Sequence, residues 1–198
     1  KRHRWVPGLY KCFDEGAVNA RDHWDRLSEK KKVKHRVTRI DFNVDKETGI
    51  ITIYNDGEGI DIEKHPEYKI WIPEMIFGHL RSSANYNKDE KKIVGGKNGF
   101  GFKLVLIYSS WGKIETVDSK RKKKYIQEFK NNLNEIGKPS IRKYTGTPYT
   151  KVSFLLDFKR FGVEKLTDDM YQVLKKRAYD MAAVTDKSVT VRWNKKNI

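Results

Sequence analysis

Apolar residues recur at helical spacing over the first part of the chain, from Val6 to Leu27, behind a Pro-Gly entry signal. This spacing predicts one long helix. A second amphipathic stretch, from Asp168 to Ala183, predicts another helix near the end of the chain. Two shorter stretches have helical character: Trp71 to Leu80 is expected to form a short helix or turn, and Phe100 to Tyr108 a helix.

Strict alternation of apolar and polar residues predicts strands between these helices. Ile40, Phe42 and Val44 alternate with polar residues, and a Glu-Thr-Gly turn leads into a second strand from Ile50 to Tyr54, so a hairpin is expected. Four further strands are expected at Ile114 to Val117, Tyr125 to Phe129, Val152 to Leu156 and Val189 to Trp193. Because strands and helices do not alternate regularly, we predict an α+β fold, a two-layer sandwich of helices packed on a mixed, mostly antiparallel sheet.

Composition limits the class of protein. A length of 198 residues suits one domain spanning residues 1–198, and 37% hydrophobic residues suffice for a core. The formal net charge of +16 implies attraction to polyanions such as nucleic acid, nucleotides or anionic membranes. A single cysteine, Cys12, excludes an internal disulfide framework and is expected to be a small packing residue. No apolar run is long enough to span a bilayer, so we expect an intracellular protein.

The first helix carries a pair of candidate catalytic side chains. Glu15 and Asn19 are one helical turn apart and therefore share a face. Hydrolysis of a γ-phosphate needs a group that orients and deprotonates water, and Mg²⁺ needs oxygen ligands. Glu15 and Asn19 could supply these, although a polar pair at this spacing is more often a solvated face.

Two glycine-bearing segments suggest contacts with a nucleotide. Asp56 follows a strand and could accept a hydrogen bond from an adenine amino group, while Gly57 and Gly59 let the backbone approach the base. A simple hairpin turn is the alternative. The segment 95–101, Gly-Gly-Lys-Asn-Gly-Phe-Gly, leads into a helix and could cradle phosphates with Lys97 and Lys103. It lacks the Gly-Lys-Ser/Thr ending of a Walker A loop.

The order of these three segments resembles the ATPase fold shared by DNA gyrase, HSP90, MutL and histidine kinases, the GHKL or Bergerat fold. Other stretches resemble the ATPase domain of type IIA DNA topoisomerases of the eukaryotic kind. They are 6–11 (Val-Pro-Gly-Leu-Tyr-Lys), 13–22, 72–78 (Ile-Pro-Glu-Met-Ile-Phe-Gly), 89–104, 150–154 and 177–182 (Arg-Ala-Tyr-Asp-Met-Ala). The resemblance covers nearly the whole chain. It implies an ATP-binding and ATP-hydrolysing domain that closes as a gate on DNA and drives strand passage.

The resemblance assigns roles to individual residues. Glu15 would be the general base, Asn19 the Mg²⁺ and phosphate contact, and Asp56 the adenine contact. Ser83 and Asn85 would touch the sugar and phosphates, and Thr150 would lie near the adenine. The triphosphate would be wrapped by Lys97, Asn98, Gly99, Phe100, Gly101, Phe102, Lys103 and Leu104.

Several residues depart from the family pattern. His23 stands where the family usually has Asn, Ala84 replaces a serine, and Lys97 replaces an arginine. Gly16 and Arg21 also differ, which suggests a divergent, viral-type member, with a location in the nucleus or, if viral, in the host cytoplasm, host nucleus or virion.

The resemblance also implies partners outside this chain. The family completes its site with a lysine from the following transducer domain and dimerises on ATP binding, partly through an N-terminal arm. We therefore expect a mostly monomeric, weakly active fragment that reaches DNA through the full-length enzyme. Two rival functions are another GHKL ATPase, MutL-like or chaperone-like, and a non-catalytic basic nucleic-acid-binding module, for which the positive charge is the only support.

Overall fold

The computed structural model describes residues 6–79 and 101–198. The helices are α1 (Pro7–Ser28), α2 (Ile72–Gly78), α3 (Gly101–Ile107), the short 3-10 helix η2 (Phe158–Phe161) and α4 (Asp168–Ala183). The strands are β1 (Arg39–Val44), β2 (Ile51–Asp56), β3 (Ser109–Asp118), β4 (Lys123–Lys130), β5 (Glu135–Ile136), β6 (Ser140–Lys143), β7 (Tyr149–Leu156), β8 (Thr190–Trp193) and β9 (Lys196–Asn197).

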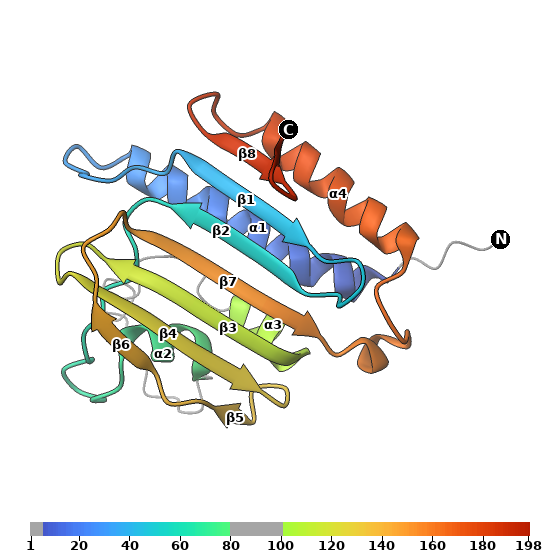
Figure 1. Ribbon diagram of the computed structural model, residues 1–198, viewed down its shortest axis with the longest axis horizontal. Helices are drawn as coiled ribbons and strands as arrows, with labels where there is room; N and C mark the ends of the chain where they lie inside the picture. Colours follow the sequence, from blue (N-terminus) through green and yellow to red (C-terminus); the bar gives the residue numbers. More distant parts are fainter. Residues whose placement is uncertain (1–5, 80–100) are drawn as a thin grey trace.

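The strands of these two segments form one sheet in the order β5-β4-β3-β7-β2-β1-β8-β9, with β6 beside β4. In this described part, neighbouring strands run antiparallel except β1 and β8, which are parallel. Figure 1 shows the helices on one side of the sheet, with α1 crossing behind β1 and β2 and α3 behind β3. The predicted α+β two-layer sandwich with a mixed, mostly antiparallel sheet is therefore confirmed.

Phe13 anchors α1 on the sheet. Its ring is fully buried and packs against Phe42 of β1 and Trp193 of β8, with ring centroids 5.6 Å and 6.4 Å away. The other sheet-facing positions of α1 follow the helical period, so this face buries continuously. They are Leu9, Cys12, Ala17 and Ala20.

A second aromatic contact joins α3 to the same core. Phe102 meets Phe77 of α2 and Phe154 of β7 edge-on, at centroid distances of 5.6 Å and 5.7 Å. Edge-to-face pairs of this kind add specific geometry to apolar burial. Cys12 belongs to the core, and burial, with a smaller effect of the Glu15 carboxylate, raises the pKa of its thiol to about 11. Its predicted role as a packing residue is confirmed.

Most predicted elements lie where the sequence pattern places them, and α4 has the predicted bounds. The hairpin between β3 and β4 is tighter than expected. Its turn ends at Lys122, because Lys123 and Lys124 already belong to β4. Lys124 itself is largely buried, because its side chain is 11% exposed and pairs with Glu115 at 2.6 Å.

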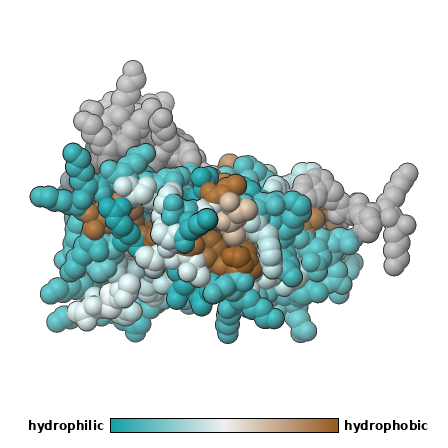
Figure 2. All heavy atoms as spheres, turned by 90° about the horizontal axis from the view of Figure 1, so that it is seen from above, coloured by the Kyte–Doolittle hydropathy of each residue, from teal (hydrophilic) through white to brown (hydrophobic). Residues whose placement is uncertain are grey.

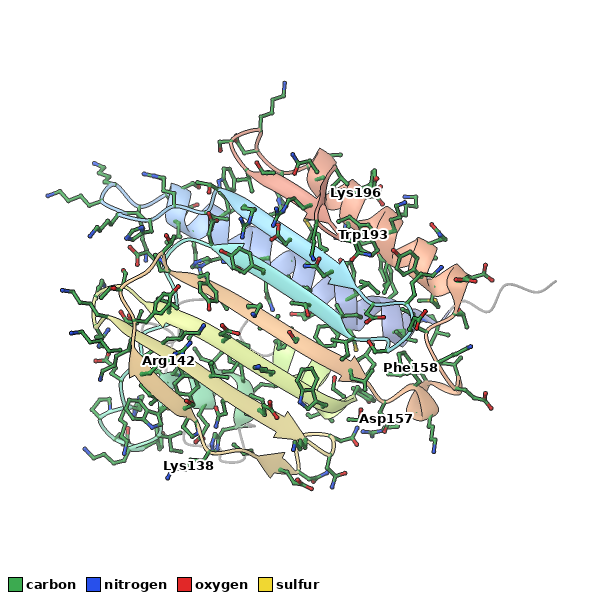
Figure 3. All side chains as sticks on the ribbon, in the orientation of Figure 1. Lys138, Arg142, Asp157, Phe158, Trp193 and Lys196 are labelled. Carbon is green, nitrogen blue, oxygen red and sulfur yellow. The ribbon has the colours of Figure 1, made fainter. Side chains whose placement is uncertain are left out.

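The surface of the molecule and the open face of the sheet are rich in polar side chains. Seen from above, the surface is largely hydrophilic, with a small group of hydrophobic residues near its middle (Figure 2). The sheet face that carries no helix bears polar and charged side chains (Figure 3). On it, Asp41 of β1 pairs with Arg39 and with Arg192 of β8, which ties the parallel strand to its neighbour.

Glu115 lies at the centre of this open face. Its carboxylate pairs with Lys124 at 2.6 Å and Lys151 at 2.9 Å, and accepts a hydrogen bond from the Tyr149 hydroxyl. Burial alone would raise the pKa of Glu115, but the bonds to Lys124, Tyr149 and Lys151 outweigh it and lower the pKa to about 2. Three strands, β3, β4 and β7, are thus joined through one carboxylate.

We predict that the Glu115 network makes the fold sensitive to acid. A depressed folded pKa contributes stability above the unfolded value near 4.5, and this contribution is lost as the pH falls through about 2. Glu115→Gln should therefore lower the free energy of unfolding at pH 7, by up to about 3 kcal/mol. Urea unfolding at pH 7 and at pH 2.5 would measure this, since the gap between variant and wild type should narrow at the lower pH. A gap of equal size at both pH values would contradict the electrostatic account.

Candidate nucleotide site

Glu15 and Asn19 lie one turn apart on α1, and Glu15 lies beside the start of α3. A Cβ atom placed on Gly101 would overlap the Glu15 carboxyl group, so the backbone of α3 begins directly against this side chain. Glu15 is partly exposed and has a long ion pair, 3.8 Å, with the solvent-exposed Lys11. Within the described part of the chain, the half-buried Asn19 amide has no hydrogen-bond partner. The Glu15 carboxylate thus adjoins Gly101, the last residue of the predicted phosphate loop, and Asn19 lies one helical turn further along α1.

A row of three polar side chains continues the helix-facing side of the sheet beyond its apolar core. Ile51 and Ile53 of β2 are buried beneath the helices, and the next residue in phase is Asn55. Asn55 is paired in register with Thr150 of β7, and Thr150 with Thr116 of β3. The two threonine hydroxyl oxygens are 3.0 Å apart. We call Asn55, Thr150 and Thr116 the polar row.

Asn55 is the member of the row that the sequence analysis missed. Its Nδ2 donates to the Asp56 carbonyl at 2.9 Å, and its Oδ1 has no partner among the described residues. An amide oxygen of this kind can accept a hydrogen bond from an amino group. The signal was available in the alternation of β2, where Ile51, Ile53 and Asn55 share one face.

Asp56 is engaged elsewhere. Its Oδ1 accepts from the backbone N–H groups of Thr38 at 2.7 Å and Arg39 at 2.8 Å, and its Oδ2 accepts from the Thr38 hydroxyl. Successive residues of a strand point to opposite faces, so Asp56 follows Tyr54 away from the helices. As an adenine contact Asp56 stays a prediction, and its three accepted hydrogen bonds hold its side chain toward Thr38 and Arg39.

The turn after β2 is tied to the polar row. Gly57 has a left-handed φ of +95°. A Cβ on Gly59 would overlap the Val117 carbonyl and lie 2.8 Å from the Thr116 hydroxyl, so only glycine lets this backbone lie against β3. The Ile60 N–H donates to the Thr116 hydroxyl at 3.0 Å. The predicted backbone approach at Gly57 and Gly59 thus serves, in this structure, to seat the turn on β3.

His23 holds the same turn from α1. Arg26 donates to its Nδ1, and because arginine can only donate, the His23 proton must lie on Nε2. Nε2 therefore donates to the Glu58 carbonyl at 2.7 Å. Burial first, and then Arg26, lower the pKa of His23 to about 4, so the ring is neutral near pH 7.

The remaining predicted site residues fall into two groups. Phe102 is a core residue, Lys103 is buried, and Leu104 is 55% exposed, so these three side chains point in different directions from α3. Thr150 belongs to the polar row. Six residues lie outside the described part: Ser83, Asn85, Lys97, Asn98, Gly99 and Phe100.

Two open hollows lie away from these groups. One, of about 440 Å³, is lined by Gly78, Asn132 and Arg160 among others, and one of about 460 Å³ runs along β4 and β5. Neither contains a residue of the polar row or α1, and the geometry gives no reason to assign a ligand to them. In the described residues there is no cluster of three metal-ligating side chains, and no helix is long and apolar enough to cross a membrane.

The sequence pattern of one family, described as histidine kinase-, DNA gyrase B- and HSP90-like ATPase, matches residues 6–158. The chain belongs to this ATPase family. The match begins just before α1 and ends after β7, so it contains Glu15, Asn19, the polar row and the glycine turn.

Within the ATPase family, the chain is clearly similar to several topoisomerase II proteins. It is 46% identical over 189 residues to DNA topoisomerase 2 of Acanthamoeba polyphaga mimivirus, covering 96% of this chain but 14% of that protein. The ATPase region of Saccharomyces cerevisiae topoisomerase II bound to ICRF-187 (dexrazoxane) superimposes with a TM-score of 0.85 at 42% identity, over 100% of this chain and 50% of that one. The 43K ATPase domain of Thermus thermophilus gyrase B, with a TM-score of 0.69 at 19% identity over 98% of this chain and 45% of that one, shares the fold. The chain thus spans about one seventh of the length of the viral relative.

We predict that His23 makes the ATPase lose stability in mild acid. The unfolded state takes up a proton near pH 6.5 and the folded state only near pH 4, so the stabilising effect present above pH 6.5 is lost as the pH falls through 4. His23→Asn, which restores the residue usual in the family, should remove this loss, of up to about 3 kcal/mol. Thermal unfolding between pH 7 and pH 4 would measure it.

His35→Asn is the matched control, because His35 contacts the glycine turn only through its backbone carbonyl, which accepts from the Glu58 N–H at 3.1 Å. It should leave the pH profile of wild type unchanged. Identical profiles for wild type and His23→Asn would rule out His23 as the titrating group.

Proposed function

We propose that this domain binds Mg·ATP between α1, the polar row and α3, and hydrolyses it as the ATPase of a type IIA DNA topoisomerase. The observation that carries the proposal is the meeting of Glu15 with the backbone at Gly101. It brings a candidate base to the end of the segment predicted to hold the phosphates. Membership of the ATPase family and 46% identity to a viral DNA topoisomerase 2 support the same function.

The adenine base of the nucleotide would bind at the polar row. Among residues 6–79 and 101–198 the Asn55 amide oxygen has no hydrogen-bond partner, and Thr150 and Thr116 present hydroxyl groups beside it. We infer that Asn55, rather than Asp56, accepts a hydrogen bond from the adenine amino group. Thr150 lies next to Asn55 in register, which agrees with its predicted place near the adenine.

At the other end of the nucleotide, Glu15 would accept a proton from the attacking water and orient it toward the γ-phosphate. The oxygen donors on this flank of α1 suit Mg²⁺, a hard cation that prefers oxygen ligands. Asn19 would hold the ion, which would neutralise phosphate charge. Lys11, 3.8 Å from the Glu15 carboxylate, is solvent-exposed and so leaves that carboxylate free to act as a base.

In the whole protein we propose that ATP binding closes two such domains around a DNA segment and that hydrolysis reopens them. The parts required for dimerisation and DNA cleavage would lie outside this chain, and so would the transducer lysine that the family adds to the site. An intracellular location follows from this function. The rival of a purely nucleic-acid-binding module predicts DNA binding by a chain that does not bind Mg·ATP at all.

We predict that Asn55→Ala weakens nucleotide binding. Calorimetry with a non-hydrolysable ATP analogue and Mg²⁺ should show a loss of affinity of about tenfold or more, because a buried hydrogen-bond partner of the base disappears. Asp56→Ala should instead lower the melting temperature, since Thr38 and Arg39 lose their acceptor. Asn43→Ala is the control for loss of an asparagine, because Asn43 lies on β1 and on the face of the sheet opposite to that of Asn55. If Asp56→Ala, and not Asn55→Ala, abolished binding in a folded protein, the assignment of the base contact would be reversed.

We predict that Glu15→Gln separates binding from hydrolysis. The amide keeps the shape of the side chain but cannot take a proton, so steady-state ATP turnover should fall by about 10²-fold or more. Binding of the ATP analogue should stay within about threefold of wild type. The turnover assay needs the longer protein that contains this domain. Unchanged turnover would show that another group activates the water.

A further inference from the structure

Three basic segments, far apart in sequence, lie at one end of the sheet. The first follows α1, the second forms the β3–β4 turn and the start of β4, and the third is the end of β6. Together we call them the basic end. Its members are Lys30, Lys31, Lys32, Lys34, Lys120, Lys122, Lys123, Arg142 and Lys143.

Strand register places these segments together. Asn55 pairs with Thr150 and Thr150 with Thr116, so the start of β1, the end of β2 and the end of β3 share one edge. At that edge Lys123 of β4 pairs with Lys143 of β6, and the Tyr144 N–H donates to the Lys122 carbonyl at 2.8 Å. The second and third segments are therefore adjacent.

The glycine turn after β2 joins the first segment to the second. The Glu58 N–H donates to the His35 carbonyl at 3.1 Å, and the Ser119 hydroxyl donates to the Glu58 carboxylate at 2.9 Å. One residue thus touches both basic segments. The arrangement is fixed by backbone and side-chain bonds and does not depend on flexible lysine side chains meeting by chance.

The positive charge of the basic end is not neutralised by its acidic neighbours. The nearby carboxylates of Asp61, Glu63 and Asp118 all pair with Arg121, which is not a member of the basic end. In the segments that the structure describes, none of the nine members of the basic end has an ion pair. Eight of the nine side chains are exposed, and Lys123 is half-buried.

The opposite end of the sheet carries charges of both signs. Lys46 pairs with Asp168 there, and Asp157 lies beside η2. In Figure 3, Asp157 and Phe158 lie at the end away from Arg142. In the described segments, the opposite end therefore pairs a lysine with a carboxylate, whereas no member of the basic end is paired in this way.

We infer that the basic end is a binding surface for the phosphate backbone of duplex DNA. Exposed, unpaired lysines on a rigid edge are the groups that neutralise DNA phosphates and release counterions. The charge pattern favours a polyanion longer than a nucleotide, since it extends over three segments. The choice of DNA over other polyanions rests on the proposed function.

The test measures binding of a fluorescein-labelled duplex of about 20 base pairs to this chain by anisotropy, at about 50, 100 and 200 mM salt. One variant carries Lys30→Gln, Lys31→Gln and Lys32→Gln; the other carries Lys120→Gln, Lys122→Gln and Lys143→Gln. Each should weaken binding by about tenfold or more and reduce the salt slope by about 1 to 3. A variant that carries all six substitutions should reduce the salt slope by the sum of the two separate reductions.

The matched control removes three exposed lysines from the opposite end, with Lys159→Gln, Lys165→Gln and Lys195→Gln. It should leave affinity and slope within about twofold of wild type, although its net charge equals that of the other triple variants. Equal weakening in all three triple variants would overturn the proposal in favour of diffuse charge. Unchanged binding in both basic-end variants would also overturn it, as would tight binding to phosphatidylserine vesicles with none to DNA.

Calorimetry of the same variants with the ATP analogue separates this inference from the proposed function. None of the substituted lysines belongs to the nucleotide site, so analogue binding should be unchanged. DNA binding that depends on these lysines in a chain unable to bind nucleotide would refute the ATPase proposal alone. Nucleotide binding without lysine-dependent DNA binding would refute the basic end alone.

Discussion

Burial of Phe13 between Phe42 and Trp193 is the contact on which the rest of this structure depends. It fixes the rotation of α1 about its own axis, because the ring can be buried in only one orientation of the helix. Once Phe13 faces the sheet, the residues two and six positions later must point away from the side of α1 that carries Phe13. Glu15 thereby lies against the start of α3 and outside the apolar core. Apolar packing thus positions the polar chemistry.

The elements with a strong period could be predicted from sequence, and those without one could not. α4 and β1 carry uninterrupted patterns and lie where expected. The two-residue strands β5 and β9 are too short to show any alternation, so nothing in their residues distinguishes them from loops. Their existence depends on the neighbouring strands that supply their hydrogen bonds.

At the candidate site, prediction from sequence was limited by the choice between two adjacent residues of one strand. A carboxylate next to glycines drew attention to Asp56, whereas the phase of the strand identifies Asn55 as the residue on the helix-facing side. A shift of one residue in a strand exchanges the two faces of the sheet, so a motif taken without its phase can name the neighbour of the residue that matters. The basic end could not be predicted either, since the segments beginning at Lys30 and Lys120 meet only through the sheet and the turn at Glu58.

The parallel pairing of β8 with β1 also has a consequence for how the chain acquires its shape. Arg192 and Trp193 come from the last strand pair, yet they complete the ion pair of Asp41 and the aromatic contact of Phe13. The first helix therefore has no finished surface to dock on until nearly the whole domain has been synthesised. Contacts between residues so distant in sequence require closure of a long loop, which slows folding. On the ribosome, α1 would wait as a half-covered amphipathic helix, exposed to chaperones and proteases, until the C-terminal strand emerged.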